Sequence, residues 1–243
     1  MNSCRLKLTP ARLEKFIKAI LESERHFLSA ENMAFLTDLY EFSKCKVKEI
    51  STGSIYYRAR INLENPDVLL PKEEMYPVPG LKSEGRANPY NVTVLYLANK
   101  PEIAVAEVRP GLFEPTTVAT FVIKRNLKLV DFTSEEQDIH NPNPHIEDLD
   151  EETRTWIEIN KCFSTSLSPG ETRLNYIPTQ IISEFFRFKG YDGVIYQSQF
   201  EMSETASDNI HENIALFEMS AAEATETKLF QIQKQIVTVR EII

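Results

Sequence analysis

The stretch from residue 85 to residue 109 places the strongest constraint on the fold. It opens with Gly-Arg-Ala-Asn-Pro and continues into residues 92–98, which are β-branched and apolar enough to form a strand covered on both faces. The Asn-Lys-Pro-Glu sequence that follows is typical of a helix start. The sequence therefore predicts a loop, a buried strand and a short helix. Arg86, Tyr96 and Glu107 bring polar groups into these small or apolar elements, a pattern that marks functional sites.

The composition fits one large domain, with or without an appendage. Of the 243 residues, 42% are hydrophobic, which is ample for a sizeable core. The 27 basic residues are outnumbered by 36 acidic ones, the net charge is −9, and no basic run follows a helix face. Because phosphate backbones are bound by clustered cations, this balance argues against a nucleic-acid partner.

The cysteines and the hydropathy indicate the compartment. Cys4, Cys45 and Cys162 are odd in number, widely spaced and without a CxxC pair, which fits a reducing cytosol. No window approaches the run of about 18 apolar residues that a membrane helix needs, and no apolar run follows the charges near the N-terminus. We expect a soluble, cytoplasmic protein with no membrane partner.

Residues 9–45 carry the start signals of two helices. Thr9 can cap the first, with Pro10 at its first position, and Ser29 can cap the second. Apolar residues fall on one face of each helix. We predict a helical hairpin packed on the following domain, with a partner-docking surface as the alternative. The expected organisation is an N-terminal helical extension over residues 1–50 and a main domain over residues 51–243.

From residue 55 the apolar pattern changes to that of a strand. Arg58 and Arg60 are two residues apart and therefore lie on the same side of it. A solvated edge strand would explain them, but the flanking tyrosines and the downstream Arg86 favour an anion-binding role. Residues 64–84, rich in proline and charge, predict a loop, with a lid as one interpretation.

The rest of the chain predicts further strands and helices. Strands are expected at residues 117–124, 128–132, 194–198, 213–217 and over most of 229–243, and helices at 151–163 and 176–190. A turn at Arg125-Asn126 joins the first two of these strands, and Trp156 is expected in the core. In the acidic insert at 133–155, His140 and His145 lack the spacing of a zinc site, so we expect no metal.

Five blocks of the sequence, taken in order, carry a resemblance to a known family. They are Tyr57-Arg58-Ala59-Arg60; Gly85-Arg86-Ala87-Asn88-Pro89; Leu95-Tyr96-Leu97-Ala98 with Ala104-Val105-Ala106-Glu107-Val108-Arg109; Pro178-Thr179-Gln180 with Gly190-Tyr191-Asp192-Gly193-Val194-Ile195-Tyr196-Gln197-Ser198; and Asn213-Ile214-Ala215-Leu216-Phe217. Together they resemble the RES domain family, which is named for arginine, glutamate and serine.

The resemblance implies a fold and an activity. Members of the family are bacterial toxins that degrade NAD by phosphorolysis or hydrolysis, and one branch ADP-ribosylates a protein. The implied fold is α+β and similar to that of ADP-ribosyltransferase toxins, with a mixed or antiparallel sheet core, flanking helices and, in this chain, the N-terminal helical hairpin. The family residues would fall on five positions, and Asn213 joins them as a binding residue. The five are Arg58, Arg86, Tyr96, Glu107 and Ser198.

The resemblance also implies a separate helix-turn-helix antitoxin as partner, and a homo-oligomer is a further expectation. The chain departs from the family pattern in three places. The hairpin and the insert at 133–155 are additions, which bear on how an antitoxin would bind. The loop at 199–212 is long and lacks the glycine often found before Asn213, which bears on the geometry around Ser198.

The residue types also suit NAD on chemical grounds. Arg58 and Arg86 can supply forked donors to the pyrophosphate, and Tyr96 offers a π face to the cationic nicotinamide ring. Breaking the nicotinamide–ribose bond builds positive charge on the sugar, which Glu107 would stabilise while holding a ribose hydroxyl. Nicotinamide leaves neutral, so no general acid is needed. Ser198 would bond the nicotinamide amide or the ribose.

Three functions follow from these considerations. The first is an enzyme that removes nicotinamide from NAD as its substrate, with no bound cofactor, and with phosphate as a possible co-substrate or water as the acceptor. The second uses the same site to transfer ADP-ribose to a protein. The third is a catalytically silent domain that uses the pocket or the hairpin to bind a partner.

Overall fold

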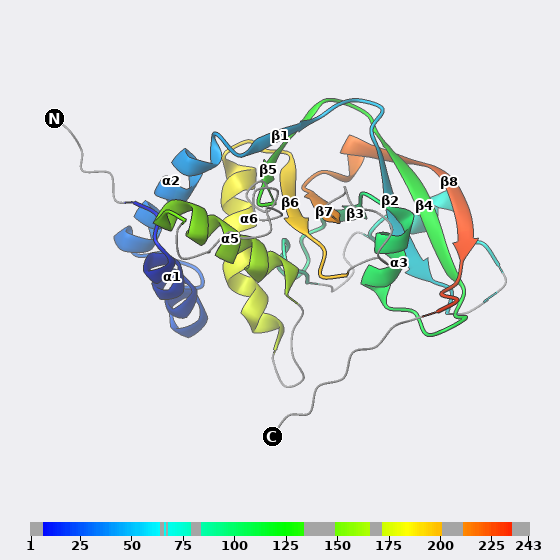
Figure 1. Ribbon diagram of the computed structural model, residues 1–243, viewed down its shortest axis with the longest axis horizontal. Helices are drawn as coiled ribbons and strands as arrows, with labels where there is room; N and C mark the ends of the chain where they lie inside the picture. Colours follow the sequence, from blue (N-terminus) through cyan, green and yellow to red (C-terminus); the bar gives the residue numbers. More distant parts are fainter. Residues whose placement is uncertain are drawn as a thin grey trace, which may run out of the picture.

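The computed structural model describes residues 7–63, 66, 68–78, 84–133, 149–165, 172–200 and 211–234. Within them lie five α-helices and one eight-stranded sheet (Figure 1). The helices are α1 (Pro10–Glu22), α2 (Ala30–Ser43), α3 (Pro101–Val108), α5 (Glu151–Ser164) and α6 (Ile177–Phe188). The strands are β1 (Val47–Ile50), β2 (Ile55–Ile61), β3 (Leu95–Ala98), β4 (Thr116–Ile123), β5 (Leu127–Asp131), β6 (Gly193–Gln197), β7 (Glu212–Leu216) and β8 (Ala222–Phe230). The α+β class is confirmed.

The sheet is mixed, with the strand order β1-β5-β6-β7-β3-β2-β4-β8. Neighbouring strands are antiparallel except β5 and β6, which are parallel. The two strands that the Arg125-Asn126 turn joins do not pair with each other. Instead β4 lies between β2 and β8, and β5 lies between β1 and β6.

This pairing produces a long two-stranded ribbon that bends midway. Strands β1 and β5 form one part of it and β2 and β4 the other. At the bend, the Thr52 N–H donates to Asn126 Oδ1 (3.0 Å) and the Gly53 N–H donates to the Ile123 carbonyl (2.8 Å). Figure 1 shows the ribbon arching from the helical end of the molecule toward β8. It therefore ties the two ends of the sheet together.

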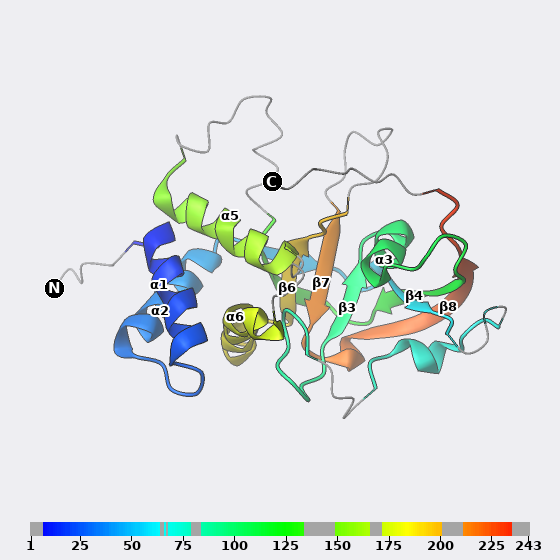
Figure 2. The same cartoon turned by 90° about the horizontal axis from the view of Figure 1, so that it is seen from below.

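Strand register divides the side chains between two faces of the sheet. Directly paired residues share a face, so Tyr57, Ala98, Asn213 and Tyr196 lie on the same one. Helices α5 and α6 pack on this face at β6, and α3 packs on it at β2 and β3. In Figure 2, strands β6, β7 and β3 run side by side with α3 toward one end and α5 and α6 toward the other. We call this the helical face.

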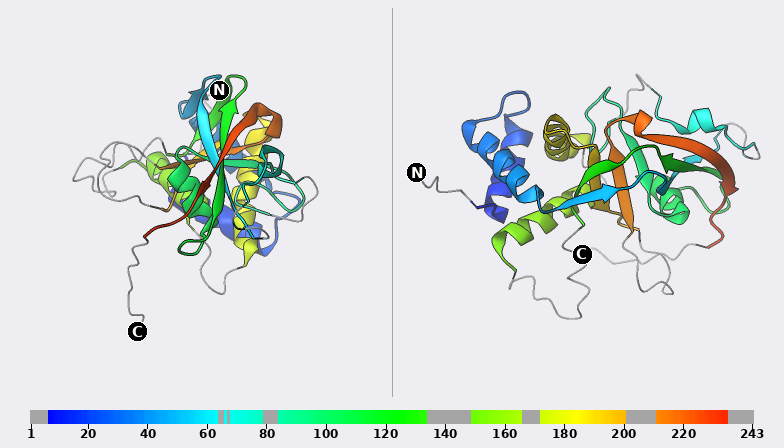
Figure 3. Two further views of the ribbon diagram at one scale, coloured as in Figure 1. Left: turned by 90° about the vertical axis from the view of Figure 1, so that its right-hand side faces the viewer. Right: turned by 90° about the horizontal axis from the view of Figure 1, so that it is seen from above.

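The N-terminal hairpin is confirmed, including its start signals. Thr9 Oγ1 accepts from the Arg12 N–H at 3.2 Å, and Ser29 Oγ accepts from the Asn32 N–H at 3.3 Å. Helix α1 packs against α5 and α6, and the rings of Phe16 and Phe35 stack at 4.9 Å within the same core. Figure 3 shows the hairpin at one end of the molecule and β8 at the other.

Strand β1 was not predicted, because residues 1–50 were expected to be a helical extension. It pairs with β5 in the main sheet, and Lys48 Nζ forms an ion pair with both carboxylate oxygens of Glu212 in β7, at 2.8 and 2.9 Å. The domain boundary after residue 50 stays a prediction, and β1, which ends at that residue, is part of the main sheet.

The predicted helices at 151–163 and 176–190 correspond to α5 and α6. Trp156 is fully buried, as expected for a core residue, and its Nε1–H donates to the Asp131 carbonyl at 3.0 Å. Gly190 follows α6 with φ at 87°, a left-handed conformation that favours glycine. None of the described helices is long and apolar enough to span a bilayer.

Two strand predictions need correction. The strand expected at 92–98 is shorter, because Asn91 adopts a left-handed conformation (φ 67°) and the Val92 N–H closes a turn to Pro89, so β3 begins at residue 95. The last strand, expected over 229–243, is β8 at 222–230. Beyond it, Ile232 forms an isolated bridge with Leu112, and residues 235–243 lie outside the described residues. So do residues 134–148 of the insert predicted at 133–155, which include His140 and His145.

Candidate functional site

The loop that carries Arg86 is held by its own hydrogen bonds and by α6. The Gly85 N–H donates to the Asn88 carbonyl at 3.0 Å, and Asn88 Nδ2 donates to the Val92 carbonyl at 2.8 Å. From α6, Gln180 Nε2 donates to the Gly85 carbonyl at 2.8 Å. The loop is therefore fixed on the helical face.

Arg86 extends from this loop to the end of α5. Its Nη1–H donates to the Phe163 carbonyl in the last turn of that helix. The last carbonyls of a helix have no intrahelical partner, and the helix dipole favours a cation there. The guanidinium also lies 5.8 Å from the centroid of the Tyr176 ring.

Tyr96, on β3, uses its hydroxyl to hold the same loop. The hydroxyl donates to Asn88 Oδ1 at 2.7 Å and accepts from the Ala87 N–H at 2.9 Å. A Cβ on Gly85 would lie only 2.6 Å from this hydroxyl oxygen, so the close approach of loop and tyrosine requires glycine. Tyr96 thus positions the loop, in addition to presenting its ring.

Arg58 reaches β3 from the other side of the sheet. Its neighbour Tyr57 lies on the helical face, so the Arg58 side chain leaves β2 from the opposite face. Its Nη1–H donates to the Tyr96 carbonyl at 3.1 Å, at a position where β2 and β3 no longer pair. Arg60, on the same side as predicted, donates through Nη2 to the Tyr76 carbonyl at 3.0 Å.

Arg58 is a desolvated cation. Burial, and then the like charge of Arg60, lowers the pKa of Arg58 from 12.5 to about 10. Among the described residues its Nε–H is buried and has no hydrogen-bond acceptor. Burial raises the pKa of Tyr96, whereas the Ala87 N–H and the charges of Arg86 and Arg58 act in the opposite direction. Both arginines therefore act on the same phenol.

Glu107, Ser198 and Asn213 form a second group, which we call the carboxylate cluster. Glu107 Oε1 accepts from Ser198 Oγ at 2.7 Å and from Asn213 Nδ2 at 2.6 Å. The three side chains come from α3, from the residue after β6 and from β7. Ser198 and Asn213 are each 5% exposed. The structure thus brings together three residues from separate parts of the chain.

Tyr196 is a further buried phenol near the candidate site. It is on the helical face, paired with Asn213, and its ring is 5.7 Å from that of Phe163. Burial raises its pKa well above 10.0, Tyr96 and the Glu107 carboxylate raise it further, and Arg86 opposes them. Arg86 in the loop and Glu107 in the carboxylate cluster therefore shift the pKa of the same buried phenol in opposite directions.

Sequence reasoning did not assign roles to Asn88, Gln180 and Tyr196, which position the predicted residues. All three stand inside the quoted blocks, beside Arg86, in the Pro-Thr-Gln segment and two residues before Ser198. A signal was therefore present, but the bond of Gln180 to Gly85 joins distant segments, and the bond of Asn88 to Tyr96 depends on how the loop folds back onto β3.

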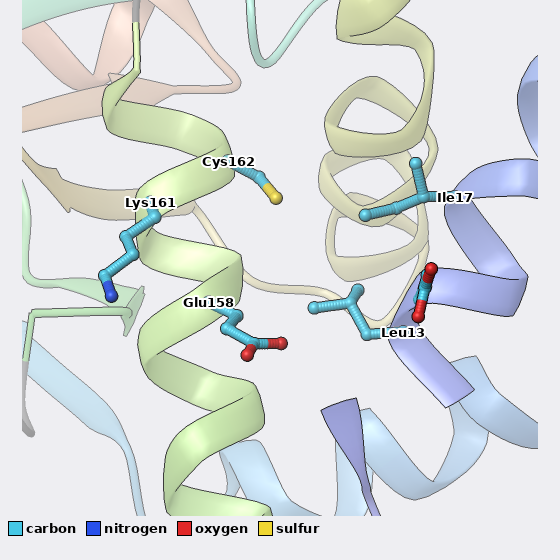
Figure 4. A pocket seen from close by; sticks show the side chains of 6 residues that line it. Leu13, Ile17, Glu158, Lys161 and Cys162 are labelled. Atoms are coloured by element: carbon cyan, nitrogen blue, oxygen red, sulfur yellow. The ribbon is translucent and has the colours of Figure 1, made fainter. Parts of the chain in front are cut away.

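The described residues contain no group of three or more His, Cys, Asp or Glu side chains placed to hold a metal ion. Two surface hollows lie elsewhere. One, of about 240 Å³, is lined by Lys7 and residues 150–152. The other, of about 290 Å³, lies between α1 and α5, where Figure 4 shows Leu13 and Ile17 opposite Glu158 and Cys162.

Comparison with models of protein families agrees with the blocks noted in the sequence. A family model described as RES domain matches residues 58–236. Among solved structures, the chain is similar to a chain in the crystal structure of the M. tuberculosis MbcT–MbcA toxin–antitoxin complex, with 12% identity and a TM-score of 0.41. That similarity covers 79% of this chain and 92% of the other. No curated protein sequence gave a significant match.

Proposed function

Because the chain belongs to the RES domain family, we propose that it cleaves the bond between nicotinamide and ribose in NAD, with phosphate or water as the acceptor. In a cell the enzyme would deplete NAD and act as a toxin. The observation that carries the proposal is the carboxylate cluster, in which Ser198 and Asn213 orient Glu107 on the helical face of the sheet, the face that also carries Tyr96.

The chemistry assigns a role to each group. The bond between C1′ and the nicotinamide nitrogen breaks, its electron pair stays on the nitrogen, and nicotinamide leaves neutral. The positive charge that develops on the ribose is stabilised by the Glu107 carboxylate, whose direction is fixed by its two donors. A phosphate or water oxygen then adds at C1′, and water releases one proton to the solvent.

The arginines support the binding of a dinucleotide. Arg58 leaves β2 from the face opposite Glu107, but it reaches the Tyr96 carbonyl where β2 and β3 no longer pair. Its buried Nε–H has no acceptor among the described residues, and a pyrophosphate oxygen that reached this point would supply one. Arg86, whose charge acts on the pKa of the same Tyr96 phenol, adds a second guanidinium. Tyr96 is a half-buried residue, and its ring would offer a face to the nicotinamide cation.

The test is nicotinamide release from NAD by the purified protein, measured by chromatography with and without phosphate. We expect release by the wild type, faster with phosphate if phosphate is the acceptor, and none by Arg86→Ala. The Glu102→Gln variant, with an exposed carboxylate on the same helix as Glu107, serves as the control. No release at any phosphate level would exclude the enzyme, and calorimetric NAD binding without turnover would favour a silent binding domain.

Transfer of ADP-ribose to a protein is the alternative outcome of the same chemistry, with a side chain in place of water. A labelled acceptor band after incubation with labelled NAD would identify it. If the labelled band were lost in Glu107→Gln, we would assign protein ADP-ribosylation, and not phosphorolysis, as the activity.

A separate antitoxin belongs to the proposal, because an enzyme that consumes NAD would harm the cell that makes it. We expect a helix-turn-helix protein from the neighbouring open reading frame to abolish nicotinamide release when it is co-expressed. Size-exclusion chromatography with light scattering would detect the complex and would also test the expected homo-oligomer.

A further inference from the structure

Arg109 follows the last residue of α3 in an unusual conformation. Its φ and ψ are 53° and 55°, in the left-handed region, and its N–H donates to the Ala106 carbonyl at 3.1 Å. A residue with a Cβ adopts this conformation at a cost. Such positions cluster at sites where the surrounding structure requires them.

The Arg109 side chain is directed to the connection that carries Ser198. Its guanidinium carbon lies 5.7 Å from the centroid of the Phe200 ring. A guanidinium within about 6 Å of a ring centroid is attracted by the π system. Arg109 thereby joins the end of α3 to the residues that follow β6.

Phe200 is in turn bonded to the serine. The Phe200 N–H donates to Ser198 Oγ at 3.2 Å, and the same oxygen donates to Glu107 Oε1 at 2.7 Å. His211 closes the base of this connection, since its carbonyl accepts from the Ser198 N–H at 2.7 Å and its Nδ1 lies 3.1 Å from the Phe200 carbonyl.

A serine hydroxyl has one proton and can rotate. When a lone pair accepts the Phe200 N–H, the remaining directions are restricted, and the proton is aimed at Glu107. If Phe200 moved away, the hydroxyl would be free to turn from the carboxylate. The direction of the serine proton therefore depends on where Phe200 is held.

We propose that Arg109 is a positioning residue, which holds Phe200 so that the hydroxyl of Ser198 donates to Glu107. The proposal deepens the proposed function and rests on it for the kinetic test. Arg109 acts through Phe200 and the serine.

The kinetic test is a double-mutant cycle on nicotinamide release. We expect Arg109→Ala to lower kcat about 2- to 5-fold with KM unchanged, the range of an exposed cation–ring contact, and Arg109→Lys to recover part of the loss. In a Ser198→Ala background, Arg109→Ala should have no further effect. An equal loss in both backgrounds, or a change in KM alone, would overturn the proposal, since Arg109 would then act without the serine.

A second measurement does not need enzyme activity. Amide hydrogen exchange of Phe200, followed by NMR, should be about 2- to 5-fold faster in Arg109→Ala, while the paired β7 amide of Ile214 stays unchanged. Phe200→Tyr should keep the protection of this amide, and Phe200→Leu should lose it.

The matched control is Lys44→Ala, which removes an exposed cation–ring contact with Tyr40 on α2 at 4.9 Å and should leave the Phe200 amide unchanged. Unchanged exchange at Phe200 in Arg109→Ala would overturn the proposal whether or not NAD is cleaved. A wild type that releases no nicotinamide, with exchange altered as expected, would instead overturn the proposed function alone.

Discussion

The two halves of the candidate site hold their polar groups in different ways. Around Arg86 and Tyr96, most of the bonds described run to backbone atoms of a loop and of a helix end. In the carboxylate cluster, Glu107 is bonded to two side chains from other elements. The first half is therefore part of the local fold, whereas the second can be altered chemically with less effect on folding.

The largest expected effect is on the carboxylate cluster. Glu107→Gln should lower kcat for nicotinamide release by about 10³-fold, about 4 kcal/mol of barrier, because the amide cannot stabilise a cationic sugar. The free energy of unfolding should change by less than about 1 kcal/mol, since the amide oxygen can still accept from Ser198. Activity assays and thermal denaturation measure both. If the free energy of unfolding fell by as much as the activation barrier rose, the carboxylate cluster would be part of the local fold, as the loop of Arg86 is.

The next effect is on the loop of Arg86. Gly85→Ala should lower the free energy of unfolding by about 2 to 3 kcal/mol, because the added Cβ would meet Tyr96 Oη at 2.6 Å and Asn88 Oδ1 at 2.8 Å. Denaturant titration measures the change. Gly111→Ala is the control, as its nearest neighbour would be 3.6 Å away. Equal effects of the two substitutions would show that the loop tolerates the side chain.

A smaller loss is expected for Tyr96→Phe. The ring remains, but the Ala87 N–H and Asn88 Oδ1 lose a partner, which costs about 1 to 2 kcal/mol in the free energy of unfolding. Tyr90→Phe, at an exposed tyrosine, controls for the change of residue type. If Tyr96→Phe raised KM for NAD and left stability intact, the hydroxyl would serve the substrate and not the loop.

The smallest effect concerns Arg58. Inorganic pyrophosphate at ten times its Kd should stabilise the wild type by about 1.4 kcal/mol, and Arg58→Gln should abolish this stabilisation because its buried cation is lost. Thermal shift with Lys44→Gln as a control of equal charge measures it. If pyrophosphate stabilised Arg58→Gln and Lys44→Gln equally, the anion would bind at a site that does not include Arg58.

Local signals predicted the helical end of the molecule best. The caps at Thr9 and Ser29 and the glycine after α6 are set by neighbouring residues, and each holds in the structure. Strand β8 was missed because it is an edge strand carrying Glu223, Glu226 and Lys228, which give no apolar alternation. The sequence also did not predict which strands pair with β4 and β5, because their partners include segments far along the chain.

The same division applies to the candidate site. The residue types at Arg86, Tyr96 and Glu107 could be singled out from the sequence, and the family blocks added Ser198 and Asn213. The sequence could not predict the hydrogen bonds of Glu107 or the approach of Arg58 from the opposite face of the sheet. Both depend on strand register and on the packing of α3.

The ion pair of Lys48 with Glu212 has a consequence for shortening this protein. Glu212 is 7% exposed and immediately precedes Asn213. A chain that began at residue 51 would leave this carboxylate, 9% exposed, without its ammonium partner. Because the Lys48 side chain is itself 38% exposed, the loss should be about 1 kcal/mol, and replacing Glu212 with glutamine would offset part of it.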